Sequence, residues 1–468
     1  MRNNFRYKLF FFLFISSIAT SYSNTILRGK APTYKGETLQ FYSFPDIITK
    51  RPESLGTCIV DNSGEFQMEF EINSIVLIHI DLGKYDGYVY SEPGKNYELV
   101  LPPRNSKTVD DRLNPYFQPQ KIHLGVSNVG KKDLNILIQR FDQVFNPFMN
   151  EYAVHKYIRK SKETDQFRFL IDSLFSGYDE MYFQNYITYK MALLDFIKYS
   201  GGKQSDFYSK FPATEVDYTN TGFRELFNQV FSRFLYYFSE TAEGAKINED
   251  IFRYRSYEKI HMAVIKSGLF QNDNLVDLLI LKGIYDEFFY NDYPKDNLLA
   301  ILDSIQQVSK IQKDQDIIDN IIWKVTRLNV GKKAPGFQLY DQVGVMAGLD
   351  TFLGKYVYLN FVSFNSYACQ IQFPILSDLA VEFKDSLVVV SICVDETFQE
   401  MKGQVENKNY SWPFLHIGNN LELLYEYDVR GYPTYFLLNR EGEFLSSPAP
   451  SAIENFKNYF SKKILNPD

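Results

Sequence analysis

The hydrophobic pattern of the first hundred residues is short and alternating. Apolar and polar positions alternate in brief runs, and turn clusters such as Asp61-Asn62-Ser63-Gly64 separate them. Alternation with a period of two between turns is typical of half-buried strands. We therefore expect a β-rich domain over residues 24–125, folded as an antiparallel β-sandwich. Its strands are predicted at residues 38–42, 57–60, 65–71, 74–80, 87–90 and 97–101.

The period becomes helical in the middle of the chain. Apolar residues recur at three- and four-residue steps, which places them on one face of a helix. The widest such stripe consists of Phe223, Leu226, Phe227, Val230, Phe231, Phe234, Leu235 and Phe238. We predict an all-helical domain over residues 126–328, and a stripe of this kind indicates a core rather than a ligand site.

Strand and helix patterns alternate after Gly331. Strands are expected at residues 356–361, 387–394, 434–438 and 443–445, and helices at 373–383 and 421–427. Ser451 and Glu454 have the spacing of a capping box, which predicts a last helix. Buried strands joined through helices favour an α/β domain at residues 329–468. The fold class expected for the whole chain is multidomain α+β.

The first 23 residues have the layout of a secretory signal peptide. Arg2, Arg6 and Lys8 precede the apolar run 9–15, and small residues lead to a cleavage point near Ser23. The apolar run is much shorter than the roughly 20 residues that span a bilayer, so we expect no integral membrane span. The mature protein is predicted in the periplasm or cell envelope.

Charge and ligand spacing exclude several classes of function. The net charge of −7 without a basic block argues against nucleic-acid binding. The five histidines and three cysteines show no metal-ligand spacing, so we expect neither a metal nor a cofactor. Three cysteines also give no disulfide framework.

Three local sequences in the C-terminal region point to one family. They are Gly331-Lys332-Lys333-Ala334-Pro335-Gly336-Phe337, Gly354-Lys355-Tyr356-Val357-Tyr358-Leu359-Asn360-Phe361 and Val429-Arg430-Gly431-Tyr432-Pro433-Thr434. Together they resemble the TlpA/ResA-type extracytoplasmic thiol-disulfide oxidoreductases of the thioredoxin superfamily, in a multidomain arrangement similar to envelope proteins of Bacteroidetes-like bacteria. The resemblance covers about residues 328–464. It implies a thioredoxin-like fold, with a cis peptide bond at Tyr432-Pro433 beside the active-site turn.

The turn after the central strand departs from the pattern of that family. Members carry Trp-Cys-x-Pro-Cys there, and the matching residues of this chain are Asn365-Ser366-Tyr367-Ala368-Cys369. The resemblance therefore places Ser366 at the nucleophile position and Cys369 at the resolving position. Gln372 stands where family members often have an acidic residue. A serine hydroxyl cannot form a disulfide, so the two-cysteine cycle is not expected to run.

We expect structural rather than catalytic roles for these side chains. Ser366 or Asn365 is suited to capping the helix that follows. Cys369 is expected to be partly buried and unreactive, and Cys393 and Cys58 to be small core residues. A peroxiredoxin motif is excluded, because the position of its proline, counted back from Cys369, holds Val362.

The sequence supports two main hypotheses for the function of this domain, and a third for the rest of the chain. The leading hypothesis is protein binding or an assembly role, with a polypeptide held in a groove of Asn365, Tyr367, Tyr432, Pro433 and Thr434. The alternative is a thiol-disulfide oxidoreductase that works through the single thiol Cys369. A third hypothesis places the function in the β-rich and helical domains.

Overall fold

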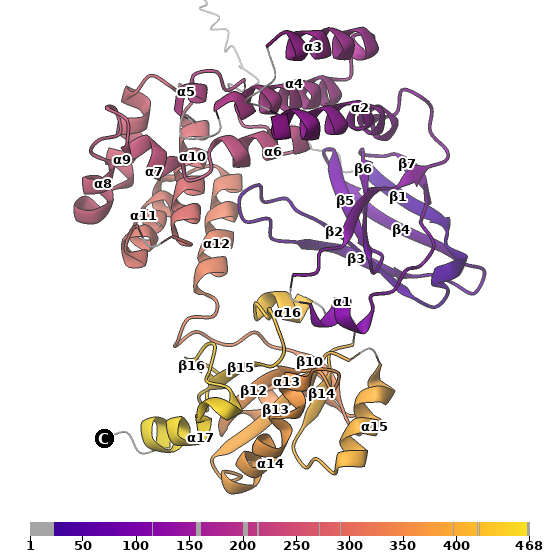
Figure 1. Ribbon diagram of the computed structural model, residues 1–468, viewed down its shortest axis with the longest axis vertical. Coiled ribbons are helices and arrows are strands. Elements are labelled where there is room, and N and C mark those ends of the chain that lie inside the picture. The colour runs from indigo at the N-terminus through magenta and orange to yellow at the C-terminus, as the bar shows by residue number, and fades with distance from the viewer. Residues whose placement is uncertain are drawn as a thin grey trace, which may run out of the picture.

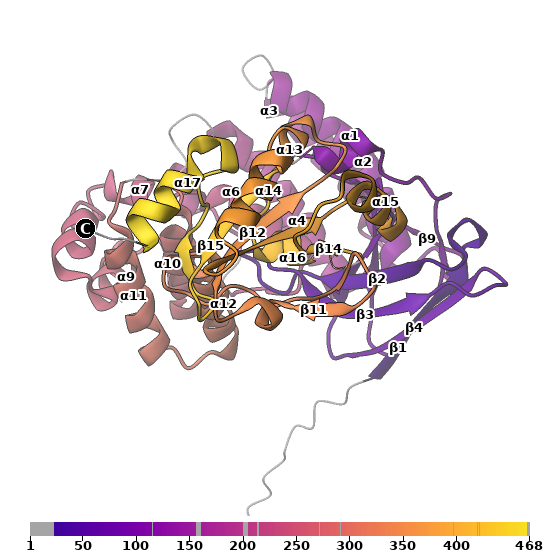
Figure 2. The same cartoon turned by 90° about the horizontal axis from the view of Figure 1, so that it is seen from below.

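The computed structural model describes residues 23–465, except for 115, 156–160, 200–204, 213–214, 271, 291, 396, 419 and 421. The predicted signal peptide lies outside the described residues apart from Ser23, which begins the first strand. A strand-rich region, a helical region and a C-terminal region with its own sheet follow one another (Figures 1 and 2). The expected mixed α+β class is confirmed.

The N-terminal region consists of two sheets. The first has the strand order β4-β1-β7-β9 and the second β3-β2-β5-β6-β8. The pairs β1–β7 and β6–β8 are parallel, so the sheets are mixed rather than purely antiparallel as predicted. The strands are β1 (Ser23–Lys30), β2 (Thr38–Ser43), β3 (Glu53–Ile59), β4 (Glu65–Ile72), β5 (Val76–Asp81), β6 (Tyr85–Ser91), β7 (Asn96–Val100), β8 (Gln120–His123) and β9 (Gly125–Val126), with the short helix α1 (Val109–Leu113) before β8.

The core between these sheets follows the predicted alternation. Phe41, Ile78, Val89 and Tyr97 are fully buried in it. The outer face of the second sheet is buried as well, because Tyr90 on β6 packs into a cluster with the first helices of the next region. This second contact explains why β5 has consecutive buried residues rather than a strict alternation.

The helical region extends from α2 to α12. Its elements are α2 (Leu134–His155), α3 (Ser161–Phe175), α4 (Met181–Phe196), α5 (Ser205–Tyr208), α6 (Thr221–Val230), α7 (Phe234–Ser239), α8 (Ile247–Glu249), α9 (Tyr257–Lys266), α10 (Asp273–Glu287), α11 (Lys295–Val308) and α12 (Gln312–Thr326). The predicted aromatic stripe is fully buried, but two helices carry it, since the chain turns at Arg233 with a positive φ of 53°. Helix α10 is buried around most of its circumference, as expected of a central helix.

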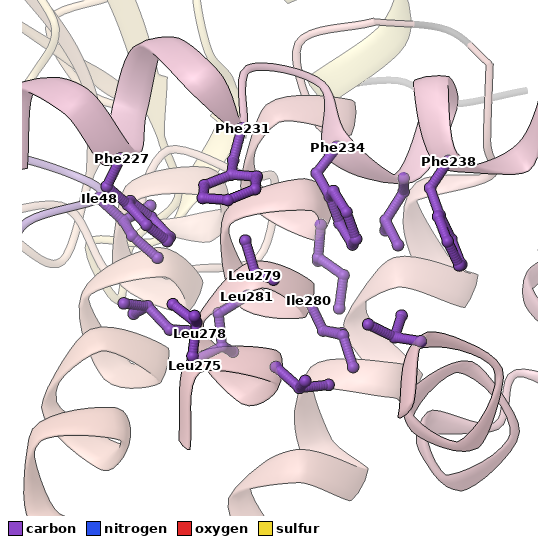
Figure 3. Packing of buried hydrophobic residues seen from close by; sticks show 14 of the residues in the cluster. Ile48, Phe227, Phe231, Phe234, Phe238, Leu275, Leu278, Leu279, Ile280 and Leu281 are labelled. Atoms are coloured by element: carbon purple, nitrogen blue, oxygen red, sulfur yellow. The ribbon is translucent and has the colours of Figure 1, made fainter. Parts of the chain in front are cut away.

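The loop between β2 and β3, residues 44–52, reaches into the helical core. Ile47 and Ile48 belong to the same buried cluster as the stripe of α6 and α7. Figure 3 shows Ile48 beside Phe227, above the leucines of α10. The strand-rich and helical regions therefore share one core.

The C-terminal region is a seven-stranded sheet with the order β11-β10-β14-β13-β12-β15-β16. Its core strands β12, β13 and β14 are parallel, and helices cover both faces. Helices α14, α15 and α17 pack on one face and α16 on the other. The elements are β10 (Gln338–Asp341), β11 (Met346–Gly348), β12 (Tyr356–Val362), α13 (Tyr367–Gln370), α14 (Phe373–Glu382), β13 (Leu387–Cys393), α15 (Phe398–Lys408), β14 (Phe414–His416), α16 (Glu422–Glu426), β15 (Thr434–Leu438), β16 (Phe444–Ser446) and α17 (Phe456–Tyr459).

A stack of cationic and aromatic side chains joins the three regions. The guanidinium of Arg51 lies 3.9 Å from the ring centre of Trp323 on α12, and Trp323 stacks on Tyr425 of α16 at 5.7 Å. Arg327 donates to the carbonyl of Glu426 at 2.8 Å. These contacts hold α16 of the C-terminal region against the end of the helical region (Figure 1). None of the helices in the described part of the chain has the length and apolarity needed to span a bilayer.

Candidate functional site

The candidate site lies where β12 ends. Strand β12 pairs with β15 in antiparallel register, with Phe361 opposite Thr434. The end of β12 therefore meets the start of β15, and this brings the turn at 363–366 beside the loop that contains Pro433. The Tyr432–Pro433 peptide bond is cis, as the resemblance implied.

Ser366 occupies the position before α13 but does not cap it. Its hydroxyl lies 3.2 Å from the carbonyl oxygen of Tyr432, to which it donates a hydrogen bond. No side chain accepts from the first amides of α13 at this position. The neighbouring Asn365 donates its amide to Asp395 at 3.1 Å instead. The predicted capping role is therefore wrong, because both side chains have acceptors outside the helix.

Asp395 is the centre of the turn, although sequence reasoning did not identify it. One carboxylate oxygen accepts from the Ser363 hydroxyl at 2.5 Å and from Asn365. The other accepts from the backbone N–H of Phe364 and from the thiol of Cys393, both at 2.9 Å. Asp395 is only 6% exposed. Four donors to one buried carboxylate fix the geometry of the turn.

A sequence signal for Asp395 does exist. Ser363 follows β12 directly, and Asp395 follows β13 by two residues. Because the carboxyl ends of parallel strands meet at the same edge of a sheet, polar residues at these positions are expected to lie close together.

Cys369 is buried beneath the turn, with 1% of its surface exposed. Burial raises the pKa of its thiol, and the negative charge of Asp395 adds to this rise. Hydrogen bonding with the Ser363 backbone and the Ser366 side chain acts in the opposite direction, but the net pKa is above its usual value. The thiol of Cys369 is therefore protonated at neutral pH.

Neither of the other two cysteines supplies an accessible thiol at the turn. Cys393 is fully buried, and burial together with Asp395 raises its thiol pKa well above the usual value. Cys58 is partly buried against the core of the strand-rich region, far along the chain from the turn.

Gln372 is a buried neutral amide held on both sides. It donates to the carbonyl of Ala368 at 3.0 Å and accepts from the hydroxyl of Tyr435 at 2.9 Å. Both interactions use a neutral side chain, so this position supplies no proton-transferring carboxylate to Cys369.

The surface around the turn is partly open. Tyr367 is 76% exposed, and Ile371, one helical turn further along, is also exposed. Tyr432, Pro433 and Thr434 are half-buried beside them. Burial is the main cause that raises the pKa of Tyr432 to about 12, so its hydroxyl stays neutral. The predicted groove residues thus surround one turn.

A cleft of about 290 Å³ is lined in part by Asp395. Val394, Asp395, Ile417 and Gly418 line it from the C-terminal sheet, and residues between 34 and 112 line it from the strand-rich region. Among the described residues, no group of three or more histidine, cysteine, aspartate or glutamate side chains is arranged to hold a metal ion.

Comparison with protein families locates this site within a known domain. Residues 330–444 match the AhpC/TSA family. Curated relatives named thiol-disulfide oxidoreductase ResA are also similar to about a quarter to a third of this chain. The relative from Bacillus thuringiensis is 28% identical over 141 residues, which cover 30% of this chain and 81% of the relative. The relative from Bacillus subtilis is 30% identical over 117 residues, which cover 25% of this chain and 65% of the relative.

Solved structures give similar matches. One is the thioredoxin domain of a thiol-disulfide oxidoreductase from Bacteroides vulgatus, at 23% identity and a TM-score of 0.27, covering 28% of this chain and 98% of that one. Another is a thiol:disulfide interchange protein DsbE from Chlorobium tepidum, at 24% identity and a TM-score of 0.26, covering 28% and 94%. Residues 330–444 are therefore a thioredoxin-fold domain of the AhpC/TSA type, similar in sequence to the ResA thiol-disulfide oxidoreductases.

Proposed function

We propose that the thioredoxin-fold domain binds a polypeptide and has lost the dithiol chemistry of its relatives. One observation supports this proposal above the others. The position that precedes α13 holds a hydroxyl bonded to the Tyr432 carbonyl, while the neighbouring thiol of Cys369 is buried.

The chemistry of disulfide reduction explains why this matters. An accessible thiolate must attack the substrate disulfide, and a second thiol must then release the mixed disulfide. Ser366 supplies no thiolate for the first step. Cys369 is sealed from solvent and its pKa is raised, so it is a poor substitute nucleophile. The single-thiol mechanism is disfavoured for the same reason.

The surroundings of the turn suit a polypeptide ligand. Tyr367 and Ile371, four residues apart, expose an aromatic and an aliphatic side chain, and aromatic residues are frequent anchors in protein interfaces. Because the Tyr432 carbonyl already accepts from Ser366, recognition depends on side chains as well as on the backbone of the Pro433 loop. We also propose that the chain acts outside the cytoplasm, since residues 1–23 have the layout of a signal peptide.

The first test measures the alkylation rate of each cysteine by mass spectrometry, in the native and the denatured protein, between pH 5 and 9. We expect Cys369 to label in the native state at least about 100-fold more slowly than after denaturation, because the native thiol is buried and protonated. Cys58 is the internal control, since it is partly exposed. Fast native labelling of Cys369 with a low apparent pKa would contradict the proposal and favour the single-thiol enzyme.

The second test restores the missing thiol with Ser366→Cys. Residues 366 and 369 have the Cys-x-x-Cys spacing, and the Cys369 N–H donates to the Ser366 carbonyl at 3.0 Å, so the variant should oxidise to a disulfide with Cys369 and gain turnover in an insulin-reduction assay. The parent chain should show no turnover above background. Ser386→Cys, remote from the turn, is the matched control. Turnover by the parent chain that Cys369→Ala abolishes would refute the loss of chemistry.

The third test addresses binding directly. A photo-crosslinking amino acid replaces Tyr367, and the probe is a reduced, carboxymethylated polypeptide of known sequence. Crosslinking should be saturable and stronger than from Tyr340, another exposed tyrosine, on β10. Equal labelling from the two positions would argue against a groove at the turn.

A further inference from the structure

The cleft of about 290 Å³ that Asp395 helps to line lies between two regions of the chain. On one side it is lined by Val394 and Asp395, directly after β13, and by Ile417 and Gly418, directly after β14. On the other side it is lined by residues of the strand-rich region, including Arg112 of α1. Figure 1 shows α1 above the C-terminal region. Both regions therefore build this cleft, and the function proposed above does not yet use it.

The cleft meets the candidate groove at Asp395. Asn365, a member of that groove, donates its side-chain amide to the Asp395 carboxylate at 3.1 Å. The backbone N–H of Phe364 donates to the same carboxylate at 2.9 Å. Because Asp395 also lines the cleft, a polypeptide segment held at the turn lies close enough to reach into it.

The strand-rich region contributes three cations to the cleft, namely Arg104, Lys107 and Arg112. Arg112 donates to the backbone carbonyl of Lys107 at 3.2 Å, which ties α1 to the loop that precedes it. That loop is itself fixed, because the backbone carbonyl of Asn105 accepts from the N–H of Lys84 at 3.0 Å. The segment that carries the cations is therefore held in place by contacts within its own region.

The carboxylates that line the cleft already have donors. Asp395 accepts four hydrogen bonds, and Asp81 accepts from a backbone N–H two residues further along at 2.9 Å. Glu37 pairs with Arg104 at 2.9 Å. The half-buried Lys107 differs from these groups, since its ammonium has no hydrogen bond or ion pair with any of the described residues. Its charge is thus available to a ligand.

Tyr34 is a second group in the cleft that lacks an acceptor. The residue lines the cleft and is only 4% exposed, and its hydroxyl is buried without a hydrogen-bond partner in the described part of the chain. Buried hydroxyls in folded proteins normally have a partner. An ammonium and a hydroxyl that both lack acceptors make the cleft rich in donors. A carboxylate is the common protein group that accepts from both.

We propose that the cleft binds an acidic side chain of the polypeptide held at the turn, with Lys107 and Tyr34 as donors to its carboxylate. This inference rests on the function proposed above and names the substrate class, a polypeptide with glutamate or aspartate beside the segment at the turn. A volume of about 290 Å³ has room for a side chain but not for a folded domain. The strand-rich region therefore contributes to the specificity of the thioredoxin-fold domain.

The experiment uses residues 23–468 at constant ionic strength and measures the fluorescence anisotropy of two labelled peptides. The peptides share one sequence, except that one has glutamates where the other has glutamines. The acidic peptide should bind at least about tenfold more tightly, because only its side chains carry carboxylates. Lys107→Gln should remove most of this difference, whereas Lys132→Gln, at an exposed lysine outside the cleft, should preserve it.

Tyr34→Phe tests the hydroxyl separately. The variant should bind the acidic peptide severalfold more weakly, while the Tm of the free chain stays unchanged or rises, because the hydroxyl has no partner to lose. Unchanged affinity for the acidic peptide would overturn the role of Tyr34 as a donor.

The inference and the proposed function fail in different ways. Equal affinities of the two peptides, with crosslinking from position 367 intact, would overturn the acidic specificity and leave polypeptide binding in place. Lack of binding by either peptide, together with no crosslinking from position 367, would overturn the proposed function and this inference with it. Succinate that binds as tightly as the acidic peptide would overturn a polypeptide as the ligand of the cleft. Equal losses of affinity in Lys107→Gln and Lys132→Gln would overturn the assignment of Lys107.

Discussion

Replacing Asp395 with asparagine is expected to loosen the turn at 363–366 without unfolding the domain. The carboxylate accepts two hydrogen bonds on each oxygen. Asparagine keeps one acceptor oxygen and places an NH₂ group where the other oxygen was. The Ser363 hydroxyl can reverse its role and accept from this NH₂, so the amide oxygen should keep Phe364 and Cys393. The remaining bonds lose their charge assistance, and the Asn365 amide loses its acceptor.

The expected loss in the free energy of unfolding follows from this count of hydrogen bonds. Hydrogen bonds to charged groups contribute about 1.5–3 kcal/mol and neutral ones about 1, so four altered bonds that partly compensate should cost about 2–3 kcal/mol. Hydrogen exchange of the Phe364 amide, which donates to Asp395, should accelerate roughly 30- to 100-fold if the turn opens locally. Asp385→Asn, an exposed aspartate of the same domain, is the control and should change neither quantity. Unaltered exchange at Phe364, with a loss of stability below about 0.5 kcal/mol, would refute the role of Asp395 as the centre of the turn.

Three further predictions concern the other regions. Ile48→Ala should lower the free energy of unfolding in urea by about 2–4 kcal/mol, because its side chain is buried in the helical core, whereas Ile59→Ala, at an exposed position, should change it by less than about 0.5. Asp314 is buried and its carboxylate accepts a hydrogen bond from Tyr218. Burial raises its pKa to about 6, so the folded state binds the proton more tightly than the unfolded state does. The free energy of unfolding therefore falls as the pH rises from about 4 to 6. Asp314→Asn should therefore stabilise the protein by about 1–2 kcal/mol at pH 7.5 and by almost nothing at pH 3.5, as measured by urea unfolding at both pH values, and an equal effect at both would contradict the assignment. Trp323→Ala removes the cation–π stack between the regions, and limited trypsin digestion should cut the segment 327–337 several-fold faster, while unchanged cleavage would show that the stack does not hold the regions together.

Much of the fold follows from hydrophobic periodicity. The strands β4 and β15 and the helix α14 fall within a residue or two of their predicted bounds, because each has a clear pattern and a turn signal at its ends. The break at Arg233 was not predicted, since the aromatic stripe continues across it at helical spacing. Strand β1 also has no clear signal, because its pairing with β4 and β7 is set by distant residues.

The candidate site was predictable in its location and not in its hydrogen bonds. The family motifs placed Ser366 and Pro433 at one turn, and the register of β12 with β15 brings them together. A local rule assigned Ser366 to helix capping, yet the Tyr432 carbonyl, 66 residues away in the chain, is its partner. Likewise the turn depends on Asp395. All of its hydrogen-bond donors except Cys393 lie about 30 residues away in the sequence. Tertiary contacts of this kind override local preference.

The loop at residues 44–52 has a consequence for the order in which the protein is made. Ile47 and Ile48 complete a core whose other members come mostly from beyond residue 189. A chain that emerges from its N-terminus therefore forms the strands around this loop while the loop still has no apolar partner. Until α6 and α10 follow, two adjacent isoleucines remain exposed to water, where they are available to other nascent chains or to chaperones. The strand-rich region thus reaches its final state only after more than half of the chain has been synthesised.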